Sequence, residues 1–378
     1  MLMTDKGEYM ERIKGKYGFG FMRLPRVDDK VDIEHSKRMV DAFLEGGFNY
    51  FDVAHPYINE TAEELLKECL TSRYPRDSYV LTNKLTSRYV NCKEDIYPML
   101  KLQLEKCGVD YFDFYLLHSV NSTRYRKFRD VGAFDELFRM KREGLVRYVG
   151  LSFHDMPEVL DEILTDYPDL DVVQIQLNYF DYDNPTVLSR QQYEVCVMHN
   201  KPVIVMEPCT GGALTRLPDE AAKVFRDLGD ASLASYGIRF AASLDNVMMV
   251  LSGVSSYEQT VENCAFMRDF KKLEDFEYEA INKAVEIIKS YNLIQCTACG
   301  YCLDGCPMGI RIPEIFSIMN AEAMHGDSFN PGFYYRDVYG SRYPLASECI
   351  ECGQCESVCP QKLPIRKYLK EATEVFRK

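Results

Sequence analysis

The sequence lacks the features that mark membrane and secreted proteins. No apolar run approaches the roughly 20 residues needed to cross a bilayer, and Val247–Leu251 is only long enough for a buried strand. The opening residues, MLMTDKGEYMERIKGK, include no apolar stretch that could serve as a secretory signal. We therefore expect an intracellular, cytoplasmic protein that has no membrane partner.

Basic residues are also scarce. The 378 residues contain 45 Lys and Arg against 58 Asp and Glu, which gives a formal net charge of −13. An acidic surface repels phosphate backbones, so we expect no nucleic-acid partner. The hydrophobic fraction of 46% and the charged fraction of 27% are typical of globular proteins and exclude a disordered or collagen-like chain.

From about residue 17 to residue 270, short apolar runs alternate with segments of helical periodicity. Strands separated by helices pair in parallel, because a crossover helix returns the chain to the same sheet edge. Eight such units over about 250 residues have the size of a closed (β/α)8 barrel, the TIM barrel of α/β proteins. The predicted strands are Gly18–Met22, Phe48–Val53, Tyr79–Asn83, Asp113–Leu117, Arg147–Leu151, Asp171–Gln176, Pro202–Met206 and Asn246–Leu251.

A doubly wound open sheet is the alternative for this pattern. It would need a G-x-G-x-x-G turn after its first strand, but Gly18-Phe19-Gly20 lies on the strand itself and no further glycine follows three residues later. The barrel is therefore favoured. We expect it over residues 1–270, followed by a connecting helix over 271–292 and a smaller domain over 293–378.

The C-terminal part is rich in cysteine. Of 14 cysteines, eight lie between Cys296 and Cys359, and in a reducing compartment such density indicates metal ligation rather than disulfides. The motif C-x2-C-x2-C-x3-C-P occurs twice, and the second copy starts 53 residues after the first. The other six cysteines are expected to be small buried hydrophobic residues; they are Cys69, Cys92, Cys107, Cys196, Cys209 and Cys264.

The repeated motif has the spacing of bacterial two-cluster ferredoxins, in which the fourth cysteine of each run ligates the other [4Fe–4S] cluster. Zinc held by C-x2-C pairs is the alternative, but two complete runs that each end in proline favour iron–sulfur. The helical stretch Ile312–Met324 between the runs predicts a mainly helical ferredoxin-like domain. The predicted ligand sets are Cys296, Cys299, Cys302 and Cys359 for one cluster, and Cys349, Cys352, Cys355 and Cys306 for the second.

Polar side chains mark the ends of three predicted barrel strands. They are Asp52 and Tyr57 in NYFDVAHPY, Lys84 in LTNK and His118 in FYLLH. Each alone has an ordinary explanation, such as a helix cap or core packing. Catalytic groups of (β/α)8 barrels lie at the carboxyl ends of the strands, where a closed barrel brings them together. The four are therefore candidate catalytic residues.

These residues resemble the aldo-keto reductase superfamily, in which an Asp, a Tyr five residues later, and a Lys and a His on the next two strands form the site. GFGFMRLPR (18–26) and GGFNYFDVAHPY (46–57) are similar to its opening signature, and VVQIQLNY, VIVMEPCTGGAL and SGVSSYEQTVEN to later ones. The whole chain resembles a subgroup that carries a C-terminal two-cluster ferredoxin domain. The resemblance implies reduction of a small carbonyl substrate by NAD(H) or NADP(H).

Carbonyl reduction by hydride requires a proton for the developing alkoxide. The resemblance implies that Tyr57 donates it and that His118 hydrogen-bonds the carbonyl oxygen. A free tyrosine has a pKa of about 10, so it needs a cationic neighbour to act as an acid near neutrality. Lys84 would be that neighbour, and Asp52 would pair with Lys84.

The resemblance also implies a set of cofactor contacts. Ser152 and Gln174 would hold the nicotinamide carboxamide; Phe153 stands where an Asn usually follows that Ser, and His154 is a candidate substitute. The other implied contacts are Pro208, Gly211, Gly212 and Leu214 in a loop over the pyrophosphate, Ser252, Ser255, Ser256 and Gln259 at the adenosine phosphate, and Glu262 and Asn263 at the adenine.

Cofactor preference is expected to depart from the family. Reductases that select NADPH usually place Lys and Arg around the 2′-phosphate, at the positions that are Val254 and Gln259 here. Without those two charges, a phosphate loses its charge-assisted hydrogen bonds. We therefore predict weaker NADPH selectivity and use of NADH.

Two functions from different classes fit the sequence. The first is a nicotinamide-dependent carbonyl reductase whose two [4Fe–4S] clusters exchange electrons with a redox partner protein or stabilise the chain. The second is an electron-transfer or regulatory module whose barrel only binds a nucleotide. Because hydride carries two electrons and a cluster accepts one, a flavin could mediate between them, although the sequence contains no identifiable flavin motif. The complete set of four candidate catalytic residues favours the first.

Overall fold

The computed structural model describes residues 12–28, 30–184, 187–290, 294, 296, 300–303, 305–325, 330–359 and 361–377. Contacts between Cα atoms divide the chain into two compact units, which are described separately. The barrel unit comprises residues 1–179, 189–208 and 234–274, and the C-terminal unit comprises residues 180–188, 209–233 and 275–378. The domain boundaries expected from the sequence, after residues 270 and 292, remain a prediction, since this division follows contacts and not the order of the chain.

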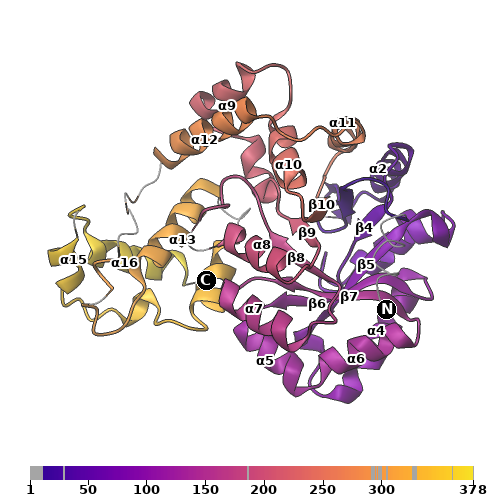
Figure 1. Ribbon diagram of the computed structural model, residues 1–378, viewed down its shortest axis with the longest axis horizontal. Coiled ribbons are helices and arrows are strands. Elements are labelled where there is room, and N and C mark those ends of the chain that lie inside the picture. Colours follow the sequence, from indigo (N-terminus) through magenta and orange to yellow (C-terminus); the bar gives the residue numbers. More distant parts are fainter. Residues whose placement is uncertain are drawn as a thin grey trace. The chain divides into compact units, whose positions relative to one another are not determined.

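The barrel unit contains eight parallel strands that close in the order β1-β10-β9-β8-β7-β6-β5-β4 (Figure 1). This confirms the predicted (β/α)8 barrel, and every predicted run overlaps one of its strands. A short hairpin that the apolar pattern did not indicate, β2 (Arg26–Val27) and β3 (Lys30–Val31), follows β1. The barrel strands are β1 (Tyr17–Gly20), β4 (Tyr50–Asp52), β5 (Val80–Thr86), β6 (Phe112–Val120), β7 (Val146–Phe153), β8 (Val172–Gln176), β9 (Val203–Met206) and β10 (Val247–Ser252).

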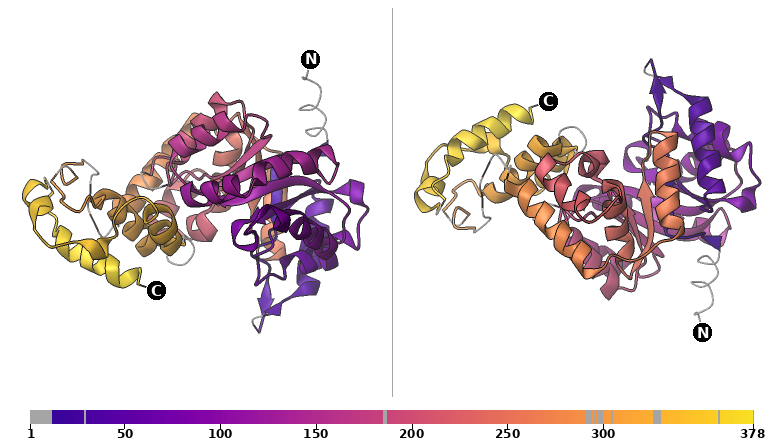
Figure 2. Two further views of the ribbon diagram at one scale, coloured as in Figure 1. Left: turned by 90° about the horizontal axis from the view of Figure 1, so that it is seen from below. Right: turned by 90° about the horizontal axis from the view of Figure 1, so that it is seen from above.

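Helices between the strands surround the barrel (Figures 1 and 2). Two of them are α5 (Ser122–Asp130) and α7 (Pro157–Asp166). Helix α5 is mostly charged and buries only Tyr125 and Phe128, which is too short an apolar stripe to reveal its period. The others are α2 (Ile33–Glu45), α3 (Ala62–Leu66) with the π-helical turn Lys67–Thr71, α4 (Ile96–Cys107), α6 (Ala133–Arg142), α8 (Ser189–Met198), α10 (Leu233–Ser243) and α11 (Tyr257–Arg268).

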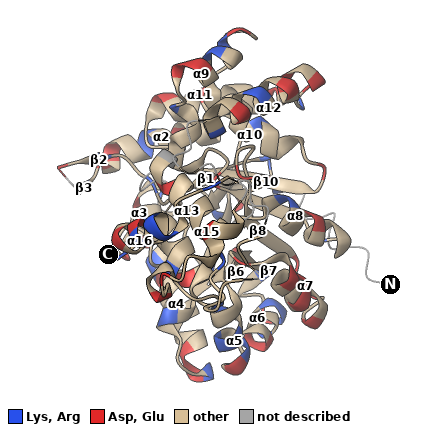
Figure 3. Ribbon diagram, turned by 90° about the vertical axis from the view of Figure 1, so that its left-hand side faces the viewer, with Lys and Arg blue, Asp and Glu red and all other residues tan. Residues whose placement is uncertain are grey.

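The barrel interior is apolar, and charged residues concentrate on helices and loops (Figure 3). Three charged residues on the barrel strands are nevertheless buried: Asp52, Lys84 and Asp113. Burying a charge is costly unless it is paired, and each of the three has an ionic partner: Asp52 and Lys84 pair with each other, and Asp113 pairs with Arg12 and Arg76. The apolar cluster includes Tyr50, Val80, Phe114, Leu116, Val172, Ile204, Met248, Met249 and Leu251.

The scattered cysteines are only partly as expected. Cys69, Cys107, Cys196 and Cys264 are buried, which confirms that prediction for them. The prediction is wrong for Cys92, which is exposed because it lies in the surface turn before α4. Cys209 is half-buried.

The described part of the C-terminal unit contains helices and loops but no strand (Figures 1 and 2). This confirms the helical character predicted for the cysteine-rich region. Both halves of the repeat enter one apolar core, with Ile310 and Phe316 from the first half and Ile365 and Leu369 from the second. Helix α9 (Asp219–Arg226) packs against α12 (Asp275–Ser290). The other elements are η5 (Thr210–Thr215), α13 (Ile312–His325), α14 (Pro331–Phe333), η7 (Tyr334–Tyr339), η8 (Ala346–Glu348), α15 (Gln354–Val358) and α16 (Ile365–Val375).

In neither unit does a helix of the described residues have the length and apolarity that crossing a bilayer requires.

Candidate active site

The four candidate catalytic residues come from three neighbouring barrel strands. Asp52 is the last residue of β4, Lys84 lies within β5, and His118 lies within β6. Strands β5 and β6 extend three residues beyond the predicted runs, to Thr86 and Val120, so Lys84 and His118 both lie within strands rather than after them. Tyr57 follows β4 in a turn. The structure therefore brings all four to the carboxyl end of the barrel, although their catalytic roles stay a prediction.

Lys84 and Asp52 form a buried ion pair. The Nζ atom of Lys84 lies 2.5 Å from Oδ1 of Asp52 and also donates to the carbonyl oxygen of Val53 at 3.1 Å. Their side chains are 1% and 5% exposed. Burial alone would lower the pKa of Lys84, but the adjacent Asp52 and Tyr57 raise it above its usual value. Lys84 therefore remains a cation at neutral pH.

Tyr57 lies between this cation and His118. The Nζ atom of Lys84 is 5.1 Å from the centroid of the Tyr57 ring, and the His118 ring is 5.7 Å away at 78°. Although the residue is partly exposed, dense packing desolvates its hydroxyl group and raises the pKa of Tyr57 above its usual value, whereas Lys84 acts to lower it. The phenol is therefore protonated at neutral pH and has a cation beside it.

His118 is oriented by a hydroxyl group and by an irregularity in its strand. Its Nδ1 atom lies 2.7 Å from Oγ1 of Thr86, its register neighbour on β5. The register of β6 shifts between Leu117 and Val120, and Ser119 has a φ of 53°. Such a bulge redirects side chains next to active sites. Burial and then the charge of Lys84 hold the pKa of His118 well below its usual value, so the imidazole is neutral.

The two residues expected at the nicotinamide carboxamide lie on the next two strands. Ser152 of β7 and Gln174 of β8 are register partners and each is 1% exposed. The Ser152 hydroxyl oxygen accepts from the Ser119 N–H at 2.7 Å. The Nε2 atom of Gln174 lies 3.5 Å from Oδ2 of Asp52, while its buried Oε1 atom has no hydrogen-bond partner among the described residues. A buried acceptor of this kind fits the amide of a nicotinamide ring.

The predicted adenosine contacts gather around the start of α11. Ser256 caps this helix by accepting from the Gln259 N–H, and the Gln259 side chain accepts from the Ser255 N–H at 2.9 Å. Val254 is buried, with 3% of its surface exposed. Neither Val254 nor Gln259 carries the positive charge that would bind a 2′-phosphate.

Other predicted cofactor residues differ in exposure. Asn263 is buried and donates to the Tyr17 hydroxyl at 2.9 Å, whereas Glu262 is exposed. Ser252 ends β10 and is half-buried. Pro208 is buried in the barrel unit. The glycines of the predicted loop, with Leu214, belong to η5 of the C-terminal unit, where Gly211 and Gly212 have φ values of 59° and 94°.

Sequence reasoning missed two polar residues near Tyr57 and His118. Thr86 is one, because a threonine on a strand gives no distinctive signal. The other is Glu207, whose charge acts on Tyr57 and whose carboxylate lies 3.5 Å from Arg23. A charged residue directly after an apolar strand, as in VIVMEPC, is the same signal that revealed Asp52.

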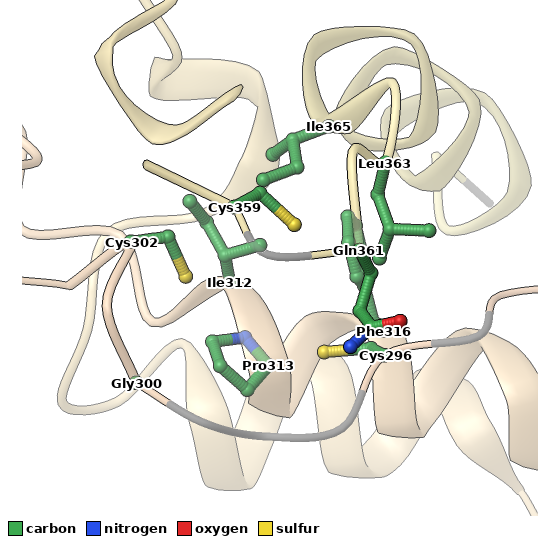
Figure 4. A pocket seen from close by; sticks show the side chains of 10 residues that line it. All are labelled: Cys296, Gly300, Cys302, Ile312, Pro313, Phe316, Cys359, Gln361, Leu363 and Ile365. Carbon is green, nitrogen blue, oxygen red and sulfur yellow. The ribbon is translucent and has the colours of Figure 1, made fainter. Parts of the chain in front are cut away.

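The first predicted cluster site coincides with a cavity in the C-terminal unit. Cys296, Cys302 and Cys359 line it, and their sulfur atoms point into the same space (Figure 4). The fourth predicted ligand, Cys299, lies outside the described residues. The other lining residues are mainly apolar, including Ile312 and Phe316 from α13. Thiolates from both motifs around an apolar cavity fit the donor set of an iron–sulfur cluster.

The second predicted ligand set differs in exposure, since Cys355 is buried, Cys306 and Cys349 are half-buried and Cys352 is exposed. Burial, with the nearby charge of Glu356, raises the pKa of Cys355 to about 11. The backbone N–H of Glu351 lies 3.4 Å from the sulfur of Cys349, and that of Ile310 lies 3.4 Å from the sulfur of Cys306. Over the described ranges, His, Cys, Asp and Glu side chains form no group of three or more arranged to hold a single metal ion.

The chain thus combines a closed (β/α)8 barrel with a helical, cysteine-rich unit. The profile of the aldo/keto reductase family matches residues 16–286, and that of a 4Fe-4S dicluster domain matches residues 295–363. The chain therefore belongs to the aldo/keto reductase family and carries a C-terminal dicluster domain.

Individual relatives agree with this membership. An uncharacterized oxidoreductase of Schizosaccharomyces pombe is 26% identical over 266 residues, which are 67% of this chain and 81% of the relative. The holo form of an aldo-keto reductase from Bacillus halodurans is 26% identical, with a TM-score of 0.59 over 72% of this chain and 92% of that chain. An aldo-keto reductase from Klebsiella pneumoniae, solved in complex with NADPH, is 18% identical and shares the fold with a TM-score of 0.58, over 71% of this chain and 90% of that one.

Proposed function

We propose that this protein is a nicotinamide-dependent reductase of small carbonyl compounds. The observation that carries the proposal is the buried Lys84–Asp52 pair beside Tyr57, at the carboxyl end of the barrel strands. A buried pair of this kind is a costly way to stabilise a core. It is well suited to placing one fixed positive charge beside a proton donor. This favours the reductase over a barrel that only binds a nucleotide.

The cofactor site would hold the nicotinamide through Ser152 and Gln174. Bound NADH or NADPH supplies the hydride in this chemistry. The buried oxygen of Gln174 would accept from the carboxamide, and this would fix which part of the ring faces the substrate.

The proton would come from Tyr57. Its raised pKa keeps the phenol protonated before reaction, and the Lys84 ammonium stabilises the phenolate left after transfer. Neutral His118 carries one ring proton. In the tautomer in which the Thr86 hydroxyl donates to Nδ1, that proton is on Nε2, which would donate a hydrogen bond to the carbonyl oxygen.

The two cysteine sets would hold two [4Fe–4S] clusters. Such clusters move single electrons, so we propose that they exchange electrons with a partner protein or stabilise the C-terminal unit. Electron paramagnetic resonance of the protein, purified anaerobically and treated with NADH or dithionite, distinguishes the two roles. Reduction by NADH supports electron exchange.

The reductase is tested by oxidation of NADH or NADPH with a panel of aldehydes and ketones. We expect Tyr57→Phe to lower kcat/KM by roughly 10²- to 10⁴-fold, because it removes the general acid. Tyr74→Phe is the matched control, since the Tyr74 hydroxyl is also hydrogen-bonded, at 2.5 Å from Asp41, but is outside the site. Turnover that survives Tyr57→Phe at the control's level contradicts the proposal.

A further inference from the structure

The turn that carries Tyr57 has an unusual backbone. The three residues after it, Ile58, Asn59 and Glu60, have φ values of 50°, 54° and 68°. Left-handed backbone is disfavoured for residues with a Cβ atom, and most of all for β-branched ones such as Ile58. Strained backbone persists only where surrounding interactions impose it, and it is common next to active sites. Something must therefore hold this turn in place.

A buried hydrogen-bonded pair closes the turn. His55 lies two residues before Tyr57, and its Nδ1 atom is 2.6 Å from Oε2 of Glu63 at the start of α3. The side chains of His55 and Glu63 are 6% and 0% exposed. The pair thus joins the two ends of the segment that contains Tyr57 and the left-handed residues.

The second carboxylate oxygen of Glu63 is connected to the backbone of Lys84 through two side chains. It accepts from Asn83 Nδ2 at 2.8 Å and from Gln103 Nε2 at 3.1 Å. Asn83 accepts in turn from the backbone N–H of Lys84 at 2.7 Å, and Gln103 donates to the backbone carbonyl of Lys84 at 3.0 Å. Both backbone groups of Lys84 are therefore fixed by side chains that bond to Glu63.

We propose that Glu63 is a positioning residue that holds the Tyr57 turn and the Lys84 strand in one fixed arrangement. This inference rests on the proposed function, since it assigns Glu63 to the proton transfer between those residues. One carboxylate bonds to the Tyr57 turn through its first oxygen and to the neighbours of Lys84 through its second. A displacement of about 1 Å between reacting groups can cost a factor of roughly 10² in rate, which makes such a link valuable.

Asp113, on the neighbouring strand β6, is a buried carboxylate with a purely structural set of contacts. It is 2% exposed, accepts from the backbone N–H of Leu81 at 2.9 Å, and pairs with Arg12 and Arg76 at 2.7 Å each. Leu81 lies near the start of β5, at the end of the barrel associated with stability rather than with catalysis. Asp113→Asn is therefore the matched control for Glu63→Gln.

The test compares these two variants in the full chain with its clusters. We expect Glu63→Gln to lower kcat by roughly 10- to 100-fold, with the Kd of NADH or NADPH unchanged by fluorescence titration. Because Lys84 lowers the pKa of Tyr57, loosening their contact should move the alkaline limb of the kcat profile to higher pH. The other groups facing Tyr57, namely Asp52, Glu207 and His118, stay as they are. Asp113→Asn should lower the melting temperature and leave that limb in place.

His55→Ala breaks the same link from the other side and carries the test if Glu63→Gln does not fold. The double variant should lose no more kcat than the larger single loss, because the two residues act as one unit. Unchanged kcat and an unchanged alkaline limb in Glu63→Gln, with only a lower melting temperature, would overturn the inference. Failure of the proposed function looks different, since Tyr57→Phe would then retain turnover in an otherwise unaltered chain.

Discussion

The hydroxyl oxygen of Thr86 lies 2.7 Å from Nδ1 of His118, across the β5–β6 pair of the barrel. This contact and the burial of the ring, which is 8% exposed, describe an imidazole held neutral. His154 is also neutral near pH 7, because burial lowers its pKa to about 3. Both rings are therefore sources of pH-dependent stability.

We expect the protein to lose stability as the pH falls below about 6.5. An unfolded histidine takes up a proton near that pH, whereas folded His118 and His154 do so only at lower pH, so acidification favours the unfolded chain. Each ring contributes at most about 1.4 kcal/mol per pH unit. Melting temperatures at pH 7.5 and 5.5 measure the effect. His118→Gln should reduce the difference between them, and His199→Gln, at the half-exposed pair with Asp161, should not.

An equal acid sensitivity in His118→Gln and the unaltered chain would contradict the neutral state of that ring. Clusters are a separate source of acid lability, so their content is checked by the iron-to-protein ratio at each pH. A loss of iron that parallels the melting temperature would assign the effect to the C-terminal unit instead.

The barrel could be predicted from the sequence because each of its strands is a short apolar run between helical segments. The predicted runs ended early on β5 and β6, where Lys84 and His118 interrupt the apolar pattern. In the sequence, a polar residue after an apolar run looks like the end of a strand. Here the strand continues past Lys84 and past His118, because both residues belong to the candidate site inside the barrel. The charged helix α5 gives only a weak helical signal in the sequence, since just two of its residues, Tyr125 and Phe128, are buried.

The candidate site was predictable in part. A residue at the end of an apolar strand is visible in sequence, as with Asp52, and so is the repeated spacing of the cysteines. Contacts between elements are not visible, because they depend on register and on side-chain direction. The hydrogen bonds of Thr86 with His118 and of Glu63 with His55 are contacts of this kind, so the sequence did not reveal them.

Cofactor preference is tested at the start of α11. We expect the unaltered chain to bind NADH at least as well as NADPH, because Val254 and Gln259 offer no charge to a 2′-phosphate. Gln259→Arg should tighten NADPH binding by roughly tenfold or more without changing that of NADH, since a hydrogen bond to a charged group contributes about 1.5–3 kcal/mol. Titration of the nicotinamide fluorescence measures both constants.

Val261→Arg provides the matched control for added charge, since Val261 is exposed on the same helix, with 43% of its surface accessible. A similar gain for NADPH in both variants would indicate general electrostatic attraction rather than a contact at Gln259. A strong preference of the unaltered chain for NADPH would refute the expectation outright.

The pairing of the cysteines into clusters makes a prediction of its own. The cavity that Cys302 shares with Cys359 places ligands from both motifs around one site, and Cys306 does not line it. If each fourth cysteine serves the other cluster, Cys302→Ser with Cys359→Ser damages one cluster, whereas Cys302→Ser with Cys306→Ser damages both. Anaerobic iron and sulfide analysis should then find roughly four iron atoms in the first double variant, against roughly eight in the unaltered chain, and almost none in the second. The reverse order would show that each motif holds its own cluster, and equal loss in both would show that the clusters depend on each other for assembly.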